Sequence, residues 1–252
     1  MKVDVIVLAG GFARRMWPLT REVPKQLLPV AGRPMLSHTL RPLLEMDEVV
    51  RVMVSTNLAF EGQFREFLSG AGDDRVELIT EPSVDEAGKL GAIGGLGHLI
   101  GKKGIERDTM VIGGDNLFEF HPREALSVFR EKGMDVVAVH DVKSMDLARL
   151  YGIVDVRGDG TISEFLEKPE RPPSTLAATA FYVLERQTLM KVPEYLGKGG
   201  KSDALGHFIR YLAESGPVFA WKFEGAWFDI GSIEVYREAD LHFRKRALGD
   251  RP

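Results

Sequence analysis

The sequence predicts an α/β fold built on a mostly parallel sheet, and two observations lead to this prediction. In the first 115 residues, four short β-branched runs alternate with helical patterns, which is the order expected of βαβ units. The first run, VDVIVLA at residues 3–9, is almost entirely apolar, as expected of a strand buried on both faces. From residue 134 onward strands follow one another with fewer helices between them, so we expect a mixed sheet.

The elements of the first half follow from periodicity and from helix-ending residues. Strands are expected at residues 3–9, 49–55, 75–80 and 109–115, and helices at residues 35–46, 59–70 and 88–101. Pro42 is expected to kink or split the first helix, because proline lacks the backbone N–H. Gly70 is expected to end the second helix. The third helix is rich in glycine, which allows close backbone approach.

The second half reads mainly as strands. They are expected at residues 135–142, 151–156, 162–167, 176–184 and 218–223. The RGDG sequence at residues 157–160 predicts a hairpin turn. A helix at residues 203–213 is expected to start at Asp203 as its cap, and a last helix is expected from about residue 232 with Ser232 as its cap. No internal repeat or long linker is present, so the sequence predicts one domain over residues 1–252.

Composition narrows the classes of function. Of 252 residues, 44% are hydrophobic and 28% are charged, as in soluble globular proteins. The net charge of −4 argues against a protein that coats nucleic acid or an anionic membrane. The chain has no cysteine, which excludes disulfides, thiolate zinc sites and thiol nucleophiles. Residues 3–9 are too few for a membrane span and lack the flanks of a signal peptide, so a cytoplasmic location is expected.

Positive charge gathers directly after the first strand, although the chain is slightly acidic. Gly10 and Gly11 allow a sharp turn that aims backbone N–H groups at an anion. The basic residues that follow are Arg14, Arg15, Arg21 and Lys25. Phosphate is the natural ligand of such a loop, which lies where open α/β sheets bind ligands. Neither G-x-G-x-x-G nor the P-loop pattern occurs, which disfavours a dehydrogenase or P-loop NTPase. On this stretch alone, a merely solvated charged face is an equal alternative.

Two aspartates point to a metal at the same edge of the sheet. VIGGD places Asp115 at the end of a predicted strand, and WFDIG places Asp229 in a late loop. Mg²⁺ usually takes one or two carboxylates and completes its shell with waters and phosphates. The alternative for each aspartate is a turn or capping residue.

Four motifs together resemble one family. They are LAGGFARRMWPLT…PKQLLPVAGRPML from residue 8, VIGGD from 111, YGIVDVRGDGTISEFLEKP from 151, and WFDIG ending at 231. They resemble the sugar-1-phosphate nucleotidyltransferases, with the glucose-1-phosphate thymidylyltransferase branch nearest. The resemblance implies a Rossmann-like three-layer α/β/α fold of the nucleotide-diphospho-sugar transferase type, with a nucleotide-binding half at about residues 1–115 and a sugar-binding half at about 116–252. The acetyltransferase-type β-helix of some relatives is not expected.

The resemblance also implies residue roles. Arg15 and Lys25 would grip the phosphates of a nucleoside triphosphate, and Asp115 and Asp229 would hold Mg²⁺. The residues implied at the nucleotide are Leu8, Gly10, Gly11, Glu81 and Gly88. The residues implied at the sugar or its phosphate are Tyr151, Gly152, Glu167, Lys168 and Thr179, with Lys201 as a further phosphate candidate. Arg15, Lys25, Asp115 and Lys168 would be the catalytic residues. Family members commonly form dimers or tetramers, so a homo-oligomer is one expected state.

The sequence leaves open which nucleotide base and which sugar the chain would bind. A carboxylate at Glu81 only accepts hydrogen bonds, so it suits N3–H of thymine or uracil, or N1–H and N2–H of guanine. We favour dTTP or UTP with glucose 1-phosphate. A GTP-dependent mannose-1-phosphate guanylyltransferase is one alternative, and a non-catalytic module that binds nucleotide sugars is another. The second is motivated by departures from the family pattern at Ala13, Arg14 and Ala180, since alanine is strained if position 13 needs a positive φ.

Overall fold

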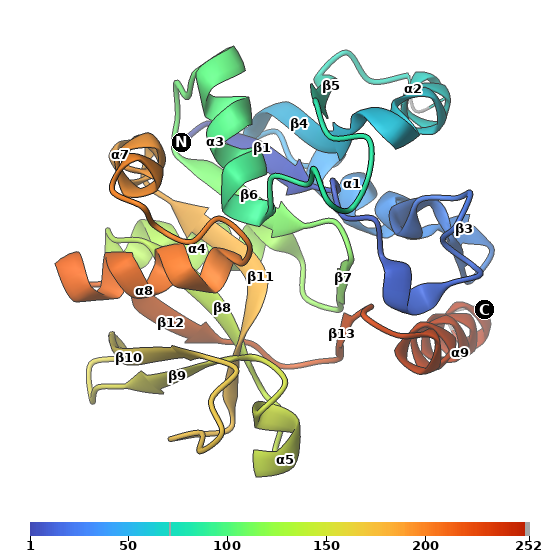
Figure 1. Ribbon diagram of the computed structural model, residues 1–252. Helices are drawn as coiled ribbons and strands as arrows, with labels where there is room; N and C mark the ends of the chain where they lie inside the picture. Colours follow the sequence, from blue (N-terminus) through green and yellow to red (C-terminus); the bar gives the residue numbers. More distant parts are fainter. Residues whose placement is uncertain (71, 250–252) are drawn as a thin grey trace.

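The computed structural model describes residues 1–70 and 72–249, and residues 250–252 of the predicted domain lie outside them. Within these residues a sheet of nine strands forms the centre of the fold (Figure 1). Seven strands follow the order β10-β9-β11-β6-β1-β4-β5, while β8 pairs with β11 and β12. The predicted α/β fold with a mixed sheet is therefore confirmed.

The strands of this sheet are β1 (Val3–Leu8), β4 (Val49–Asn57), β5 (Val76–Glu81), β6 (Thr109–Gly113), β8 (Val136–Asp141), β9 (Gly152–Val156), β10 (Ile162–Glu167), β11 (Leu176–Leu184) and β12 (Phe219–Lys222). The α-helices are α1 (Met35–Leu44), α2 (Glu61–Ser69), α3 (Ala92–Lys103), α4 (Pro122–Lys132), α5 (Met145–Ala148), α6 (Arg186–Leu189), α7 (Val192–Gly197), α8 (Leu205–Ser215) and α9 (Ile233–Gly249). Two small sheets pair β2 (Pro29–Val30) with β3 (Arg33–Pro34) and β7 (Asn116–Phe118) with β13 (Trp227–Asp229), and the 3₁₀ helices are η1 (Arg14–Met16), η2 (Lys25–Leu27) and η3 (Leu58–Phe60).

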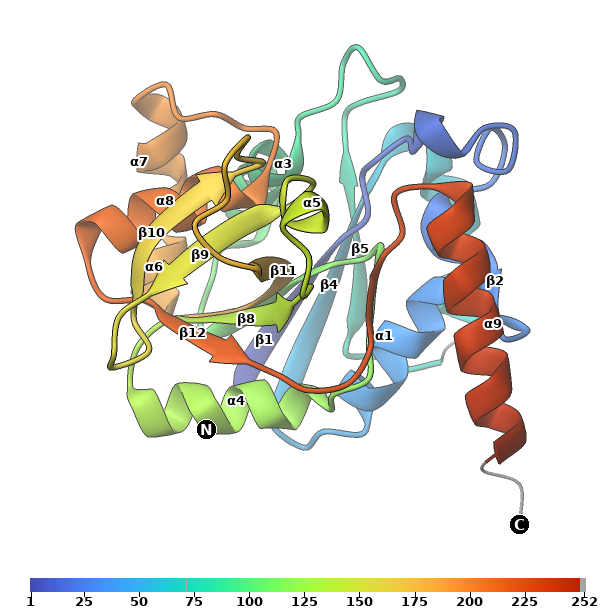
Figure 2. The ribbon, with the colours of Figure 1, turned by 90° about the horizontal axis from the view of Figure 1, so that it is seen from below.

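The first half of the sheet is parallel and lies between two layers of helices. Strand β1 pairs in parallel with β4 on one side and β6 on the other. Val3, Val5 and Val7 of β1 pack with residues of α1, α2 and α4, whereas Ile6 packs with residues of α3 and α8. Figure 2 shows α1 and α4 on one side of the sheet and α3 and α8 on the other. Burial on both faces explains why β1 is an uninterrupted apolar run rather than an alternating one.

The second half of the sheet is built around the long strand β11. It pairs antiparallel with β6 through residues 181–184 and with β8 along most of its length. Strands β9 and β10 form the predicted hairpin, joined by the turn at residues 157–160. The carboxyl end of β10 and the amino end of β9 lie together, with Glu167 opposite Gly152.

The last helix packs back onto the amino-terminal half (Figure 1). Helix α9 follows the predicted cap, since Ser232 Oγ accepts a hydrogen bond from Val235 N at 3.3 Å. Partly buried side chains of α9 pack against a small cluster that includes Met16, Leu28 and Val30. Among the described residues, no helix combines the length and the apolar character needed to span a membrane.

Three predictions about helices are wrong. The predicted split of α1 at Pro42 does not occur, because the proline lies in the last turn and removes only one hydrogen bond. Helix α3 starts at Ala92 rather than residue 88, where its first N–H groups donate to the carbonyls of Ser202 and Asp203. Helix α8 starts at Leu205 without a side-chain cap, so Asp203 does not have the predicted capping role.

Several elements of the second half were not predicted, and α4 is the clearest case. Its signal was present in the sequence as a capping box between His121 and Glu124 followed by a proline at the first helical position.

Candidate active site

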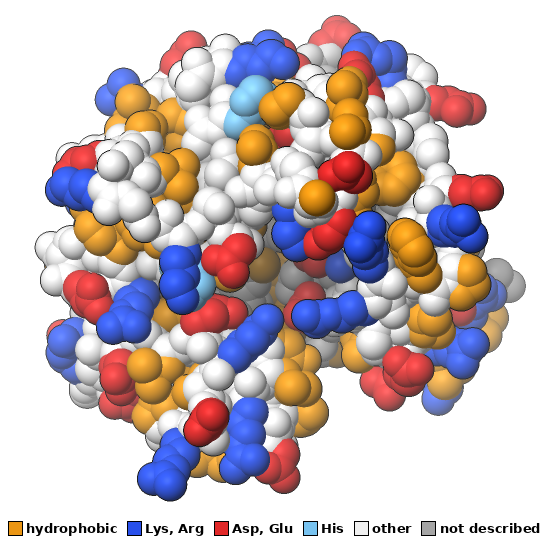
Figure 3. All heavy atoms as spheres, in the orientation of Figure 1, with side chains coloured by type: hydrophobic (Ala, Val, Ile, Leu, Met, Phe, Trp, Pro, Cys, Tyr) orange, Lys and Arg blue, Asp and Glu red, His pale blue; other side chains and the backbone are white. Residues whose placement is uncertain are grey.

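A cavity of about 750 Å³ opens where β1 and β6 end, and this volume is in the range of small-molecule sites. Figure 3 shows a hollow in the middle of this face, with Lys, Arg, Asp and Glu side chains gathered around it. Most of the residues predicted for the site line this cavity. They are Leu8, Gly10, Gly11, Arg15, Lys25, Glu81, Asp115, Tyr151, Gly152, Glu167, Lys168 and Asp229. Both halves of the chain therefore contribute to one cavity.

The loop after β1 is strained at Ala13, as expected if this position takes a positive φ. Ala13 has φ 49 and ψ 41, in the left-handed region that costs a residue with a Cβ about 1 kcal/mol. Two hydrogen bonds hold the loop in this shape: Thr20 Oγ1 donates to Ala13 O at 2.8 Å, and Asn57 Nδ2 donates to Gly10 O at 3.0 Å. The turn brings Ala13 and Arg15 to the cavity wall.

Lys25 is the central cation of the site. Its Nζ donates to Asp115 Oδ2 at 2.7 Å and to Ile230 O at 2.6 Å, and the residue is only 8% exposed. Burial acts to raise the pKa of the Asp115 carboxyl, but the charge and hydrogen bond of Lys25 outweigh it, so this pKa lies below its ordinary value. Asp115 is therefore held as a carboxylate.

A second carboxylate lies beside Asp115. Strands β7 and β13 pair antiparallel with Asp229 opposite Asn116, and Ile230 N donates to Asp115 O at 3.0 Å. Burial, followed by the negative charge of Asp115, raises the pKa of Asp229 to about 6. Lys25, Lys168 and Arg15 act in the opposite direction without reversing this shift, so a bound cation would stabilise the charged form of Asp229.

The donor set fits Mg²⁺. The described residues contain no cluster of three or more His, Cys, Asp or Glu side chains that would hold a metal on its own. Two adjacent carboxylates instead match the usual Mg²⁺ site, in which substrate phosphates and waters supply the remaining oxygens.

The β9–β10 hairpin forms the other end of the cavity. Glu167 is half-buried there, and burial raises the pKa of its carboxyl. Space for this carboxylate comes from Gly206 at the start of α8, because a Cβ there would lie 2.3 Å from Glu167 Oε2. Lys168 follows with φ 47, and its N–H donates to Tyr151 O at 3.0 Å. An acceptor and a cation thus face the same space, as a hydroxylated ligand with a phosphate would require.

Glu81 is a buried carboxylate at the end of β5. It lies between Gly10 and Gly95, where an added Cβ would come within 2.7 and 2.5 Å of Oε1. Ser55 Oγ donates to Oε1 at 2.8 Å, while burial raises the pKa of the Glu81 carboxyl. With Ser55 on one oxygen, the carboxylate keeps acceptor sites for a ligand that offers N–H groups.

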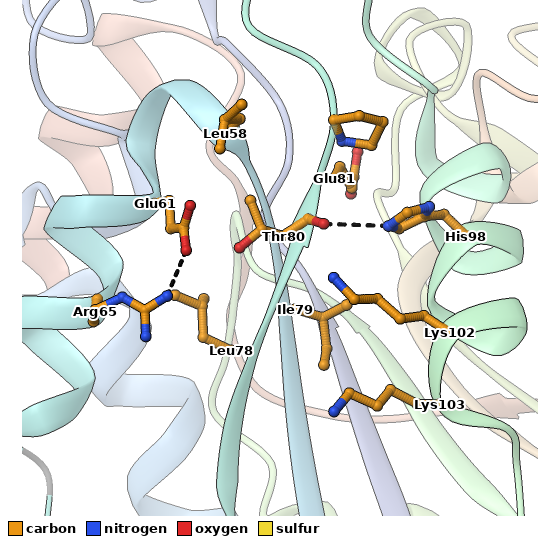
Figure 4. A pocket seen from close by; sticks show the side chains of 11 residues that line it. Leu58, Glu61, Arg65, Leu78, Ile79, Thr80, Glu81, His98, Lys102 and Lys103 are labelled. Carbon is orange, nitrogen blue, oxygen red and sulfur yellow. Dashed lines mark hydrogen bonds and ion pairs between the residues drawn. The ribbon is translucent and has the colours of Figure 1, made fainter.

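A second, shallower cavity of about 540 Å³ lies on the outer side of β5 between α2 and α3 (Figure 4). Its polar groups largely satisfy one another. Arg65 pairs with Glu61, and His98 Nε2 donates to Thr80 O at 3.2 Å. This cavity shares only the Glu81 residue with the larger one.

The structure does not bring every predicted residue to the cavity. Thr179 is fully buried within the sheet, where its Oγ1 donates to Ala138 O at 2.9 Å. Gly88 lies in the exposed loop before α3, with its N–H bonded to Asp85 Oδ1. Lys201 is also exposed and does not line the cavity. The unplaced Arg14 extends over the Trp17 ring, 5.5 Å from its centroid, outside the cavity lining.

Other cavity residues were not assigned from the sequence. They are Gln26, Lys89, Asn116, Arg149, Asp203, Gly206 and Trp227, among others. Asn116 and Gln26 directly follow predicted residues, and Trp227 opens the WFDIG motif, which are the signals the sequence offered. Ala180 lines the cavity as its departure from the family pattern suggested.

Comparison with known proteins agrees with this geometry. The nucleotidyl transferase family model matches residues 4–246. A Mycobacterium tuberculosis mannose-1-phosphate guanylyltransferase is 32% identical over 95% of this chain, and a Haloferax volcanii UTP–glucose-1-phosphate uridylyltransferase is 28% identical over 96%. The chain spans 65% of the first relative and 97% of the second, and 62% of a Sulfolobus acidocaldarius relative that is 28% identical.

Solved structures show the same fold. A Bacillus anthracis protein described as a glucose-1-phosphate thymidylyltransferase, solved with sucrose, superposes with a TM-score of 0.82 at 25% identity, covering 96% of this chain and 95% of that one. The match of the family model over residues 4–246 shows that the chain belongs to the nucleotidyl transferase family.

Proposed function

We propose that this chain transfers a nucleotidyl group from a nucleoside triphosphate to a hexose 1-phosphate. A phosphate oxygen of the sugar 1-phosphate forms a bond to the α-phosphorus. The bond from that phosphorus to the oxygen of the β-phosphate breaks, and the electron pair of this bond leaves with the pyrophosphate. The observation that carries the proposal is the cluster of Lys25, Asp115 and Asp229 in one cavity with Arg15 and Lys168.

The reaction needs charge neutralisation more than proton transfer. A phosphate monoester has a second pKa of about 6, so the nucleophile is already ionised near pH 7 without a general base. Arg15 and Lys25 would offset the triphosphate charge, and Lys168 would hold the sugar phosphate. Mg²⁺, held by Asp115 and Asp229, would stabilise the negative charge that develops on the phosphate oxygens.

We further propose that the two halves of the chain divide the substrates. Residues 1–115 would bind the nucleotide through the Gly10–Gly11 turn and Glu81, and residues 116–252 would bind the sugar through Tyr151 and Glu167. The position of Glu81 and Glu167 in one cavity supports this division. In one domain, both substrates would then meet at the end of β1.

We favour dTTP or UTP with glucose 1-phosphate, with GTP and mannose 1-phosphate as the second candidate. The acceptor character of Glu81 suits either set of bases. The relatives include a UTP–glucose-1-phosphate uridylyltransferase and a mannose-1-phosphate guanylyltransferase, so both candidates have a precedent.

A substrate screen tests the proposal. The chain is incubated with Mg²⁺, each of ATP, GTP, CTP, UTP and dTTP, and a panel of hexose 1-phosphates, and pyrophosphate is measured. We expect release with at least one pair and its loss in the Asp229→Asn variant. Absence of release with every pair, together with calorimetric binding of a nucleotide sugar, would instead favour the non-catalytic module.

A further inference from the structure

Asp115 is the end of a chain of hydrogen bonds that starts at Trp227. The indole Nε1–H of Trp227 donates to Asn116 Oδ1 at 2.7 Å, and Asn116 Nδ2 donates to Asp115 Oδ1 at 2.9 Å. Asn116 is only 3% exposed, so water offers its amide little alternative. The two strands that carry Trp227 and Asn116 pair directly, which fixes this contact across 111 residues of sequence.

The indole N–H of Trp227 determines which atom of the Asn116 amide accepts and which donates. An indole N–H can only donate, so the side of the Asn116 amide that faces Trp227 must be its oxygen. The NH₂ group then necessarily faces Asp115, whose carboxylate can only accept. Without the indole N–H, Oδ1 of Asn116 loses its donor, and only the carboxylate itself holds the amide in this orientation.

The two oxygens of Asp115 therefore have different partners. Oδ2 accepts from Lys25 Nζ, and Oδ1 accepts from Asn116. Lys25 is also one of the groups proposed to bind the triphosphate, whereas the partners of the Asn116 amide are Trp227 and Asp115. The hydrogen bond from Asn116 is then the contact that keeps the Asp115 carboxylate in place when Lys25 binds phosphate.

The Trp227 ring has a second contact that does not involve its N–H. It lines the cavity and packs against Tyr151 with ring centroids 4.9 Å apart. Substitution by phenylalanine removes the donor and keeps a smaller aromatic ring for this contact. The two functions of the side chain can thus be separated by experiment.

We propose that Trp227 and Asn116 are positioning residues that orient Asp115 for the divalent cation. This inference rests on the proposed function, because it takes Asp115 as a ligand of that cation. Mutation of a residue that orients a metal-binding side chain typically lowers the metal affinity 10–100-fold. We expect loss of the indole N–H to weaken cation binding about tenfold, at the lower end of that range.

The test measures Mn²⁺ binding by electron paramagnetic resonance, in the presence of a non-hydrolysable nucleoside triphosphate analogue and without sugar phosphate. The variants are Trp227→Phe, Asn116→Ala and the double variant. Trp221→Phe is the matched control, because Trp221 packs on Phe120 and its indole N–H donates to no residue that the structure describes. Thermal melts accompany each measurement, so that a folding defect is recognised.

We expect Trp227→Phe to bind Mn²⁺ about tenfold more weakly, and Trp221→Phe to bind it as the wild type does. Because Trp227 acts through Asn116, adding Trp227→Phe to Asn116→Ala should change the affinity no further. Additive effects of the two substitutions, or wild-type affinity in Trp227→Phe, would overturn the inference. If the wild type binds no Mn²⁺ together with the nucleotide analogue, the proposed metal site itself is wrong.

Discussion

Replacement of Lys25 by methionine tests the charge arrangement at the centre of the cavity. The substitution keeps most of the apolar stem and removes the ammonium group that lies 2.7 Å from Asp115 Oδ2. Asp115 then loses its ion-pair partner, and Lys168 and Arg15 are the cations that remain near Asp229 in the free protein. We expect a loss of stability, because Asp115 loses its ion-pair partner. We also expect a loss of turnover, because Lys25 would offset the charge of the triphosphate.

The magnitude follows from the distance and the burial. Two unit charges 2.7 Å apart attract by about 6 kcal/mol at an effective dielectric constant near 20, before the cost of desolvation is subtracted. Removing one partner of a buried pair costs about 3–5 kcal/mol. Because the Asp115 side chain is 33% exposed, we expect the lower end, about 3 kcal/mol, which corresponds to a fall of about 6–12 °C in Tm.

The assay is thermal unfolding with and without Mg²⁺, in the absence of nucleotide. Since Lys25 competes with a cation for Asp115, Mg²⁺ should raise the Tm of Lys25→Met more than that of the wild type. Lys222→Met, which removes an exposed pair with Asp141 at 3.1 Å, is the control and should cost under about 1 kcal/mol. A Lys25→Met variant with wild-type Tm and turnover would refute this account of Lys25.

Three further predictions concern other parts of the chain. Ala13→Gly should raise stability by about 1 kcal/mol in urea unfolding, because it relieves the positive φ, and unchanged or lower stability would contradict this. Gly206→Ala should lower kcat/KM for the sugar phosphate about 10–100-fold by displacing Glu167, with the KM for the triphosphate nearly unchanged, and equal effects on both substrates would contradict it. Burial raises the pKa of Asp135 to about 6, so the folded state holds the proton more tightly than the unfolded chain, and stability from this group is present below pH 4 and is lost as the pH rises through 6. Asp135→Asn should therefore gain about 2 kcal/mol more over the wild type at pH 7.5 than at pH 4.5 in urea unfolding, and an equal gain at both would contradict the shift.

Local pattern was sufficient for most of the sheet. Strand β1 is buried on both faces and reads as a continuous apolar run, and the β9–β10 hairpin has an explicit turn sequence. Local pattern failed where distant backbone replaces a side-chain cap. The carbonyls of Ser202 and Asp203 receive the first N–H groups of α3, so neither the start of α3 nor the role of Asp203 could be read from nearby residues.

The site was likewise predicted where local sequence was sufficient and missed where distant segments decide the contacts. The turn at Gly10 and Gly11 and the position of Asp115 were predicted, because strand ends in a parallel sheet meet at one edge, whereas Asp229 was predicted from a motif in a late loop. Thr179 was misplaced, because the side of β11 to which a residue points depends on how that strand crosses between its partners. The contact of Trp227 with Asn116 depends on the pairing of β7 with β13, which lie 111 residues apart at this contact and are too short for periodicity to reveal.

The most direct test of the proposed reaction is ³¹P nuclear magnetic resonance of the complete mixture, with a nucleoside triphosphate, a hexose 1-phosphate and Mg²⁺. The account predicts that pyrophosphate and the diphosphate of a nucleotide sugar appear together in equal amounts, and that Asp229→Asn forms neither. Release of orthophosphate without a nucleotide sugar, or an unchanged spectrum with every substrate pair, would contradict it.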